Sequence, residues 1–403
     1  MSNGEPLNLE PALQRIVSKA LANEHYAGVF EAFCDELASA GVPLLRAHLT
    51  MHALHPLVSS VALTWLRGQG LDVNPRVYTP APAHEWLRSP LYWMLSNEQW
   101  ELRQDLRDKD VVREFPVFAE FRNLGATDYL ALMTPFGDPE TAFERSDGIL
   151  TSWISDAPEG FSEHHINAIK HLQPYVGLVS KLSKQDYTVH NVLSAYLGED
   201  AGRRVLEGQI RLGDVEHIPA IIWFSDLRDS TAMAERMPVE IFLQAVNAYF
   251  DCTAGAVLEH GGEVLRFIGD AVLAVFPVAT NESAARAAHQ ALAASREARQ
   301  RLAALNERRA AQSEEQLAFG LGLHAGELLY GNIGVPTRIE FSVIGPAANE
   351  VSRLESLTKE VGEPVLVSRA FKEVVDLPWR NLGVYRLKGV GDGMEVFAPP
   401  ETN

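Results

Sequence analysis

The sequence predicts an α+β protein with two folded regions joined by a helical segment. The chain has 403 residues, too many for one ordinary hydrophobic core. Hydrophobic residues make up 46% of it, which favours folded domains over disorder. In both halves, short apolar runs alternate with stretches of helical periodicity. We therefore expect an N-terminal domain at residues 1–161, a helical linker at 162–217 and a C-terminal domain at 218–403.

Composition excludes several classes of function. The formal net charge is −18 and no basic block stands out, which argues against binding a nucleic-acid backbone. Cys34 and Cys252 fall in different predicted domains, so we expect neither a disulfide framework nor a cysteine-rich metal site. We find no signal peptide pattern and no membrane-spanning run, because the apolar stretch Leu45–Leu66 is broken by Arg46, by three histidines at positions 48, 52 and 55, and by Pro56. We expect a soluble, cytoplasmic protein.

The N-terminal region predicts an antiparallel sheet with flanking helices. Residues 9–37 have helical apolar spacing, interrupted near Gly28. From Leu45 the pattern alternates, which predicts a strand with one apolar face and one wet or pocket-lining face carrying Arg46 and His48. We expect further strands at residues 60–66, 129–134 and 148–154, and a helix at 89–106.

Two groups of side chains in this region are candidate ligand-binding residues. His48 and His52 share a strand face and could ligate a metal or a haem, but no third ligand is evident, so we favour a plain polar face. Aromatic-rich concave sites are common ligand pockets, although ordinary packing accounts for most large aromatics. The tryptophans concerned are Trp65, Trp86, Trp93, Trp100 and Trp153.

A helix begins at Ser162 and carries an apolar stripe, with a kink expected at Pro174. The stripe either packs on its own domain or pairs with a second chain. A second helical region, Val192–Ile210, has breaks at Gly198 and Gly202, and we interpret it as the element that couples the two domains. The stripe consists of Ile166, Ile169, Leu172, Val176, Val179 and Leu182.

Two aspartates organise the C-terminal region. Asp226 closes the apolar run 220–224, which is typical of a buried strand, and Asp270 lies in a Gly-Asp turn between two short apolar runs. Neither position offers the His or Cys that zinc prefers, and oxygen ligands suit Mg²⁺ or Mn²⁺. If the strands are neighbours, both carboxylates can hold metal over a triphosphate. The alternative is that each Asp only ends its strand.

The segment Asp229-Ser230-Thr231 is typical of a helix N-cap, which would aim backbone N–H groups at an anion. The remaining pattern predicts a mainly antiparallel sheet compatible with a ferredoxin-like βαββαβ core. We expect strands at residues 220–225, 264–268, 271–276, 317–324, 340–344, 364–367, 384–387 and 394–397, and helices at 238–260, 282–309 and 347–357.

Three motifs stand in order along this region: FSDLRDST at residues 224–231, GGEVLRFIGD at 261–270 and FSVIGPAANEVSRL at 341–354. On these motifs, residues 218–397 resemble the catalytic domain of class III adenylate and guanylate cyclases. The N-terminal layout, closing on Ser152-Trp153 and Gly160-Phe161-Ser162-Glu163, is similar to GAF-type sensory domains, for which an unknown small-molecule or protein signal is expected.

The resemblance implies that Asp226 and Asp270 hold two Mg²⁺ or Mn²⁺ ions, with the backbone carbonyl of Leu227 as a further ligand. It implies that Arg353 stabilises the pentacovalent phosphate and that Asn349 orients the ribose. A spacing of four residues places these two side chains on one helix face. Lys388 resembles the lysine that binds the terminal phosphate, although a solvated turn lysine is an alternative. The family shares each site between two subunits, so a homodimer is implied.

Base selection is where the sequence departs from the family. Adenine-specific relatives use a lysine and an aspartate or threonine, and Arg266 and Ser342 stand at those positions. Arginine only donates hydrogen bonds, which suits N1 of adenine, whereas a hydroxyl can donate or accept. We therefore favour ATP over GTP. In addition, Asp229-Ser230 replaces the usual Gly-Phe, and Glu363 stands near the place of a family arginine.

The sequence thus predicts an adenylate cyclase that converts ATP to 3′,5′-cyclic AMP and pyrophosphate and is regulated by its N-terminal domain. A guanylate or other nucleotidyl cyclase stays open because of Arg266 and Ser342. An inactive nucleotide-binding signalling scaffold is a further alternative. We disfavour a diguanylate cyclase, because Gly261-Gly262-Glu263 matches its signature only in part and the third motif would go unexplained.

Overall fold

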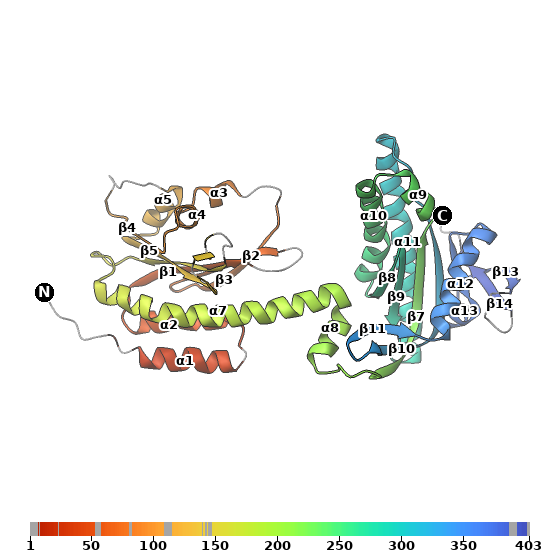
Figure 1. Ribbon diagram of the computed structural model, residues 1–403, viewed down its shortest axis with the longest axis horizontal. Coiled ribbons are helices and arrows are strands. Elements are labelled where there is room, and N and C mark those ends of the chain that lie inside the picture. Colours follow the sequence, from red (N-terminus) through yellow and green to blue (C-terminus); the bar gives the residue numbers. More distant parts are fainter. Residues whose placement is uncertain are drawn as a thin grey trace. The chain divides into compact units, whose positions relative to one another are not determined.

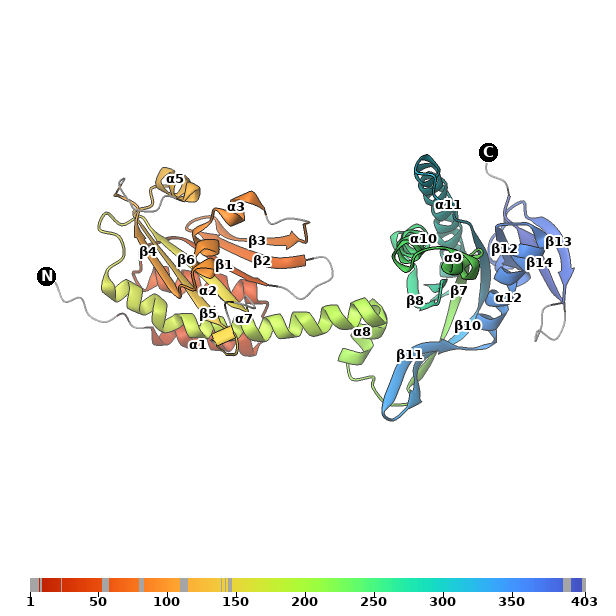
Figure 2. The same cartoon turned by 45° about the horizontal axis from the view of Figure 1, so that its top comes forward.

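The chain forms two compact units, Met1–Ala195 and Tyr196–Asn403 (Figure 1). The structure is a computed structural model that describes residues 7–400 except 8, 23, 53–57, 80–82, 109–114, 139, 142, 144–146 and 387–392. Each unit combines a β-sheet with helices on its faces, as Figures 1 and 2 show. The predicted α+β class is confirmed.

The sheet of the first unit has six strands in the order β3-β2-β1-β6-β5-β4, and every neighbouring pair is antiparallel. The strand β1 lies near the middle, so its two faces contact different layers of the unit. The strands are β1 (Leu44–His52), β2 (Val58–Leu66), β3 (Gly70–Val77), β4 (Glu101–Asp105), β5 (Asp128–Pro135) and β6 (Gly148–Ser155).

Helices cover both faces of this sheet (Figures 1 and 2). On one face lie α1 (Glu10–Leu21), α2 (Tyr26–Ser39) and the first part of α7 (Glu163–Leu197), packed over a core that includes Trp153. On the other face lie the short helices, over a second core that includes Phe118. The short helices are α3 (His84–Leu87), α4 (Pro90–Ser96) and α5 (Pro116–Asn123).

Two predictions for this unit were wrong, and one strand was missed. The first helical stretch divides into α1, which ends at Leu21, and α2, which begins at Tyr26, so Gly28 is inside α2. The helix expected at 89–106 ends at Ser96, because the chain turns at Asn97 and continues as the edge strand β4. The strand β3 was not predicted. It is polar and contains Pro75, features that an edge strand tolerates but that give no apolar signal.

The helix α7 runs unbroken over 35 residues and contains Pro174. Most of the predicted stripe packs into the core of the first unit, whereas Leu182 is 55% exposed. A break at Gly198 is confirmed, because this glycine has a φ of 89° and α8 (Glu199–Leu206) begins directly after it. The break expected at Gly202 was wrong, because Gly202 lies buried inside α8.

The sheet of the second unit has the order β13-β14-β12-β10-β7-β9-β8, and β11 pairs with the end of β10. The longest pairing joins β10 to β7, and β10 with β12 is the parallel pair among the described strands. The strands are β7 (Val215–Leu227), β8 (Glu263–Ile268), β9 (Ala271–Pro277), β10 (Phe319–Val335), β11 (Arg338–Ile344), β12 (Val365–Ser368), β13 (Arg380–Tyr385) and β14 (Met394–Ala398).

Alternation along β7 separates two cores in this unit. Ile221 and Trp223 point into the larger core, beneath α10 and α11, while Ala220 and Ile222 point toward α12. The strand is therefore buried on both faces, as its continuous apolar run predicts. The helices are α9 (Ser230–Arg236), α10 (Val239–Glu259), α11 (Asn281–Ala311), α12 (Pro346–Val361) and α13 (Arg369–Val374).

Within the described residues, α10 is the one helix long and apolar enough to cross a membrane by length and composition. Its side chains Ala245, Tyr249, Ala256 and Val257 are buried in the core under the sheet. Its apolar character is thus the character of a helix that packs on a sheet.

Replacing the fully buried Trp223 by alanine should lower the free energy of unfolding by about 3–5 kcal/mol, because it leaves a cavity between β7 and α10. Urea denaturation followed by circular dichroism measures this loss. The matched control is Leu258→Ala on α10, where the side chain is 58% exposed, and its effect should stay within about 0.5 kcal/mol. Equal effects of the two variants would contradict the assigned core.

Candidate active site

The two aspartates predicted to work together lie side by side. Asp226 is the last but one residue of β7 and pairs with Ala271, the first residue of β9. Asp270 immediately precedes Ala271, in the two-residue turn that joins β8 to β9. Gly269 forms the first position of this turn with a φ of 65°. The register of the sheet therefore brings the two carboxylates within hydrogen-bonding reach of each other.

This closeness changes the electrostatics of the pair. Partial burial, and then the charge and hydrogen bond of Asp270, raise the pKa of Asp226 to about 6. The atom Oδ2 of Asp270 is buried and has no hydrogen-bond partner among the described residues. The charges of Arg228 and Lys359 oppose the rise in the pKa of Asp226 only in part, so two partly buried carboxylates held together remain costly, and a bound cation would reduce that cost.

The residues present fit a hard divalent cation. Two carboxylates provide oxygen ligands, and the described part of the chain holds no cluster of three or more His, Cys, Asp and Glu suited to a metal. Such a donor set is poor for zinc, whereas Mg²⁺ is usually held by one or two carboxylates together with substrate phosphates. Asp226 and Asp270 are the side chains that would hold Mg²⁺ or Mn²⁺, and Leu227, the last residue of β7, directly follows Asp226.

A buried ion pair that the sequence analysis missed supports the end of β7. Nη1 of Arg228 lies 3.1 Å from Oε1 of Glu355 on α12, and Nη2 donates to the hydroxyl of Thr358. The side chain of Glu355 is 3% exposed, and its burial raises its pKa to about 7, against the lowering effect of Arg228. Gly320 on β10 leaves the space that these groups fill, because a Cβ atom there would collide with all three.

This ion pair left a readable signal in the sequence. Helical spacing places Val351, Leu354 and Thr358 on the buried face of α12, and Glu355 lies on the same face. A carboxylate on a buried helix face needs a cationic partner. Arg228, which directly follows β7, was the candidate partner that the sequence offered.

The predicted N-cap cluster is only partly right. The helix α9 begins at Ser230 as expected, but the side chain of Asp229 makes no capping hydrogen bond. Asp229 has a left-handed backbone with a φ of 56°. Its carboxylate lies 3.9 Å from Nζ of Lys359 instead of at the helix N-terminus.

Asn349 and Arg353 share the exposed face of α12, as their spacing predicts. Arg353 forms no ion pair with any residue that the structure describes. It stands two residues from the buried Glu355, and two residues correspond to about 200° around a helix. Arg353 and Asn349 therefore point away from the Asp226 carboxylate of the same chain.

The two residues predicted to recognise the nucleotide base contact each other. Nη1 of Arg266 on β8 donates to the hydroxyl of Ser342 on β11 at 3.2 Å. Nη2 of Arg266 also pairs with Glu340, at 2.6 Å, which the sequence analysis did not single out. Lys388 lies outside the described residues, and Glu363 pairs with Arg380 at 2.6 Å.

Comparison with known families identifies this arrangement. Residues 215–398 match the model of the adenylate and guanylate cyclase catalytic domain. The second unit is a cyclase catalytic domain. The match begins at the first residue of β7 and ends at the last residue of β14, so it contains every strand of the second sheet.

Curated relatives align with this cyclase domain. An "Adenylate cyclase" of Anabaena cylindrica is 34% identical over 162 residues, which cover 39% of this chain and 31% of the relative. "Adenylate cyclase 1" of Rhizobium meliloti (strain 1021) is 31% identical over 180 residues, which cover 43% of this chain and 26% of the relative. The chain thus spans less than a third of the length of these two relatives.

Solved structures align as well. The adenylyl cyclase CyaB from P. aeruginosa matches at 24% identity with a TM-score of 0.43, over 47% of this chain and 97% of that one. A bacterial light-regulated adenylyl cyclase matches at 26% identity with a TM-score of 0.46, over 57% of this chain and 64% of that one.

The cyclase domain should become more stable without metal when Asp226 is replaced by asparagine. The pKa of Asp226 is raised from its ordinary 3.8 to about 6, so the folded state keeps a proton that the unfolded state releases. The free energy of unfolding of the wild type therefore falls as pH rises through this window, and an uncharged amide at this position cannot contribute to that fall. We expect a gain of about 1–2 kcal/mol for Asp226→Asn at pH 8, and little difference at pH 3.5.

Urea denaturation in EDTA at the two pH values measures this difference. The control is Asp251→Asn on the exposed face of α10, which removes one carboxylate and leaves the pair of Asp226 and Asp270 intact. Saturating Mg²⁺ should raise the free energy of unfolding of the wild type more than that of Asp226→Asn, and so reduce or reverse the difference between them. A variant that is no more stable than the wild type at pH 8 would refute the strained carboxylate pair.

Proposed function

We propose that this chain is an adenylate cyclase that converts ATP to 3′,5′-cyclic AMP and pyrophosphate. The observation that carries the proposal is the closeness of the Asp226 and Asp270 carboxylates, where the buried Oδ2 of Asp270 has no hydrogen-bond partner among the described residues. Two aligned relatives that carry the name adenylate cyclase support it. An inactive scaffold would have no need of two carboxylates held together at this cost.

In the proposed reaction the ribose 3′-oxygen forms a bond to the α-phosphorus, the bond from that phosphorus to the pyrophosphate oxygen breaks, and the hydroxyl proton is released. Mg²⁺ or Mn²⁺ held by Asp226, Asp270 and the Leu227 carbonyl would supply Lewis-acid activation of the hydroxyl and neutralise the leaving pyrophosphate. The guanidinium of Arg353 offsets charge on the pentacovalent phosphate, and the Asn349 amide orients the ribose.

The proposed enzyme is a homodimer with two shared sites. Asn349 and Arg353 point away from Asp226 in their own chain, because they lie across α12 from Glu355. They can meet the carboxylate pair only if it comes from a second copy. Lys388 remains a predicted ligand of the terminal phosphate.

The exposed face of α7 supports a dimer independently. Apolar side chains between Leu178 and Tyr196 are exposed and follow a heptad, with Tyr196 the most exposed at 85%. This stripe differs from the predicted one, which is mostly buried in the first unit. A heptad stripe is the pattern by which two helices form a coiled coil. Its members are Leu178, Leu182, Val189, Val192 and Tyr196.

Adenine is the proposed base because Arg266 can donate to its unprotonated N1, while Ser342 can accept from the exocyclic amine. Guanine is the second candidate, and one observation favours it. The carboxylate of Glu340 lies beside Arg266 and could accept from the N1–H and amine of guanine. We favour adenine because Arg266 already neutralises Glu340.

We further propose that the first unit regulates the cyclase domain through α7, a single helix that leaves the first unit and reaches Leu197. We place the enzyme in the cytoplasm, in keeping with two free, buried cysteines.

The variants Asp270→Ala and Arg353→Ala should each lower cyclic AMP formation at least about 100-fold, because each removes one half of both sites. Mixed in equal amounts, they should recover about a quarter of wild-type activity, because half of the dimers are mixed and each mixed dimer has one intact site. Product formation from ATP and Mn²⁺ is followed by mass spectrometry.

The control for this experiment is a mixture of Asp270→Ala with Asp226→Ala. These variants damage the same half of the site, so no activity should return. Tag pull-down verifies that Asp270→Ala and Arg353→Ala chains have formed mixed dimers. If these mixed dimers are inactive, the shared-site arrangement is wrong.

Replacing Arg266 by glutamate should lower the ratio of kcat/KM for ATP to that for GTP by about 10-fold or more, because a carboxylate accepts from guanine N1–H and repels adenine N1. The control is Arg338→Glu, an exposed arginine of β11 without an ion pair among the described residues. An unchanged ratio in Arg266→Glu would show that this position does not read the base.

A further inference from the structure

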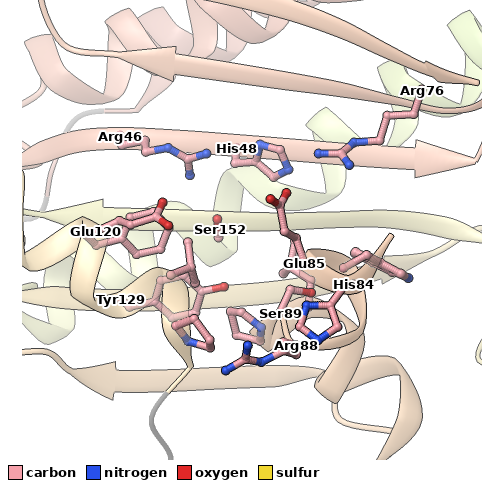
Figure 3. A pocket seen from close by; sticks show the side chains of 16 residues that line it. Arg46, His48, Arg76, His84, Glu85, Arg88, Ser89, Glu120, Tyr129 and Ser152 are labelled. Atoms are coloured by element: carbon pink, nitrogen blue, oxygen red, sulfur yellow. The ribbon is translucent and has the colours of Figure 1, made fainter. Parts of the chain in front are cut away.

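A cavity lies on the sheet of the first unit, on the face covered by α3, α4 and α5 (Figure 3). Its volume is about 290 Å³, at the lower end of the range of small-molecule sites. The alternation of β1 points Arg46 and His48 into it, while Ala47 and Leu49 point into the opposite core. The predicted pocket-lining face of β1 is therefore confirmed.

Three arginines line this cavity, and none of them forms an ion pair with a described residue. Arg46 comes from β1, Arg76 from β3 and Arg88 from the segment between α3 and α4. Figure 3 shows Arg46 and Arg76 on the two sides of His48. Glu85, Glu120 and His84 also line the cavity, and its three arginines and two glutamates leave one excess positive charge in a chain of net charge −18.

Arg46 is the deepest of these charges. Its guanidinium lies 5.2 Å from the centre of the Phe121 ring, and burial lowers its pKa. His48 contributes no charge, because burial, Arg46 and Arg76 lower its pKa to about 3. Its Nδ1 shares a hydrogen bond of 2.9 Å with the hydroxyl of Thr64, so its other nitrogen is left for the cavity. The charge of Glu120 partly opposes the lowering of the Arg46 pKa, but Glu120 forms no ion pair with Arg46, and an anionic ligand would offset the remaining cost of burying the guanidinium.

The walls define the rest of the ligand. Trp86, Leu91, Phe121 and Tyr129 are apolar or aromatic, and burial raises the pKa of Tyr129 so that its phenol stays neutral. A planar guanidinium matches a carboxylate in a bidentate pair. A single excess positive charge, with two glutamates nearby, disfavours a dianion such as a phosphate monoester.

From this cavity we infer that the first unit binds a small organic monoanion, a carboxylate on a flat apolar body, with the carboxylate on Arg46 and the body against Trp86 and Phe121. This site does not depend on the cyclase reaction. The inference gives a chemical class to the signal expected at the N-terminal domain, which the sequence did not identify.

Isothermal titration of the full-length protein with naphthoate tests this assignment. Naphthoate should bind saturably, and the neutral isostere naphthamide should bind at least about 10-fold more weakly, because it cannot form the charged pair. Arg46→Gln should raise the Kd for naphthoate about 10- to 100-fold. The control is Arg67→Gln, which lies outside the cavity lining and should keep wild-type affinity.

Several outcomes would overturn the inference. They are an absence of saturable binding at millimolar naphthoate, equal binding of naphthoate and naphthamide, and tighter binding of naphthyl phosphate than of naphthoate. Should Arg46→Gln fail to fold, Trp86→Ala replaces it, because the apolar body of the ligand lies against this ring, and an unchanged Kd in that variant would count equally against the site. Because binding is read by heat, the result is independent of cyclase activity.

Discussion

The antiparallel register between β7 and β9 is the constraint on which the candidate active site depends. It sets Asp226 opposite Ala271, and Asp270 precedes Ala271 in a turn too short to place its carboxylate elsewhere. A slip of one residue would send one carboxylate to the other face of the sheet. The long pairing of β7 with β10 and the burial of Trp223 and Ile222 on opposite faces hold this register. Core packing thus fixes the position of two charged groups that repel each other.

The end of β7 holds both the two carboxylates that repel each other and an ion pair that stabilises this part of the chain. The raised pKa of Asp226 results from partial burial and then from the closeness of a second acid, while the buried pair of Arg228 with Glu355 joins the chain after β7 to α12. Because α12 exposes Arg353 on its opposite face, one helix supports the carboxylates of its own chain and offers an arginine outward. The proposed dimer follows from this division of the helix.

The sequence predicted what local periodicity and turn chemistry decide. The hairpin around Asp270, the helix bearing Asn349 and Arg353, and the two faces of β1 all follow from spacing alone. The strands β3 and β4 were missed or mistaken because edge strands are polar and carry no core pattern. The pair of Arg266 with Glu340 joins positions far apart in the chain, so only the folded structure could show it. For Glu355 the sequence indicates only that a buried carboxylate needs a cationic partner, and the fold shows that this partner is Arg228.

The most direct test of the central claim is a crystal of the protein grown with Mn²⁺ and a non-cyclisable ATP analogue, examined by anomalous diffraction. The account predicts Mn²⁺ peaks within coordination distance of the carboxylates of both Asp226 and Asp270, with Arg353 of the partner subunit against the α-phosphate. Peaks bound to neither aspartate, or an Arg353 from the same chain at the phosphate, would contradict it.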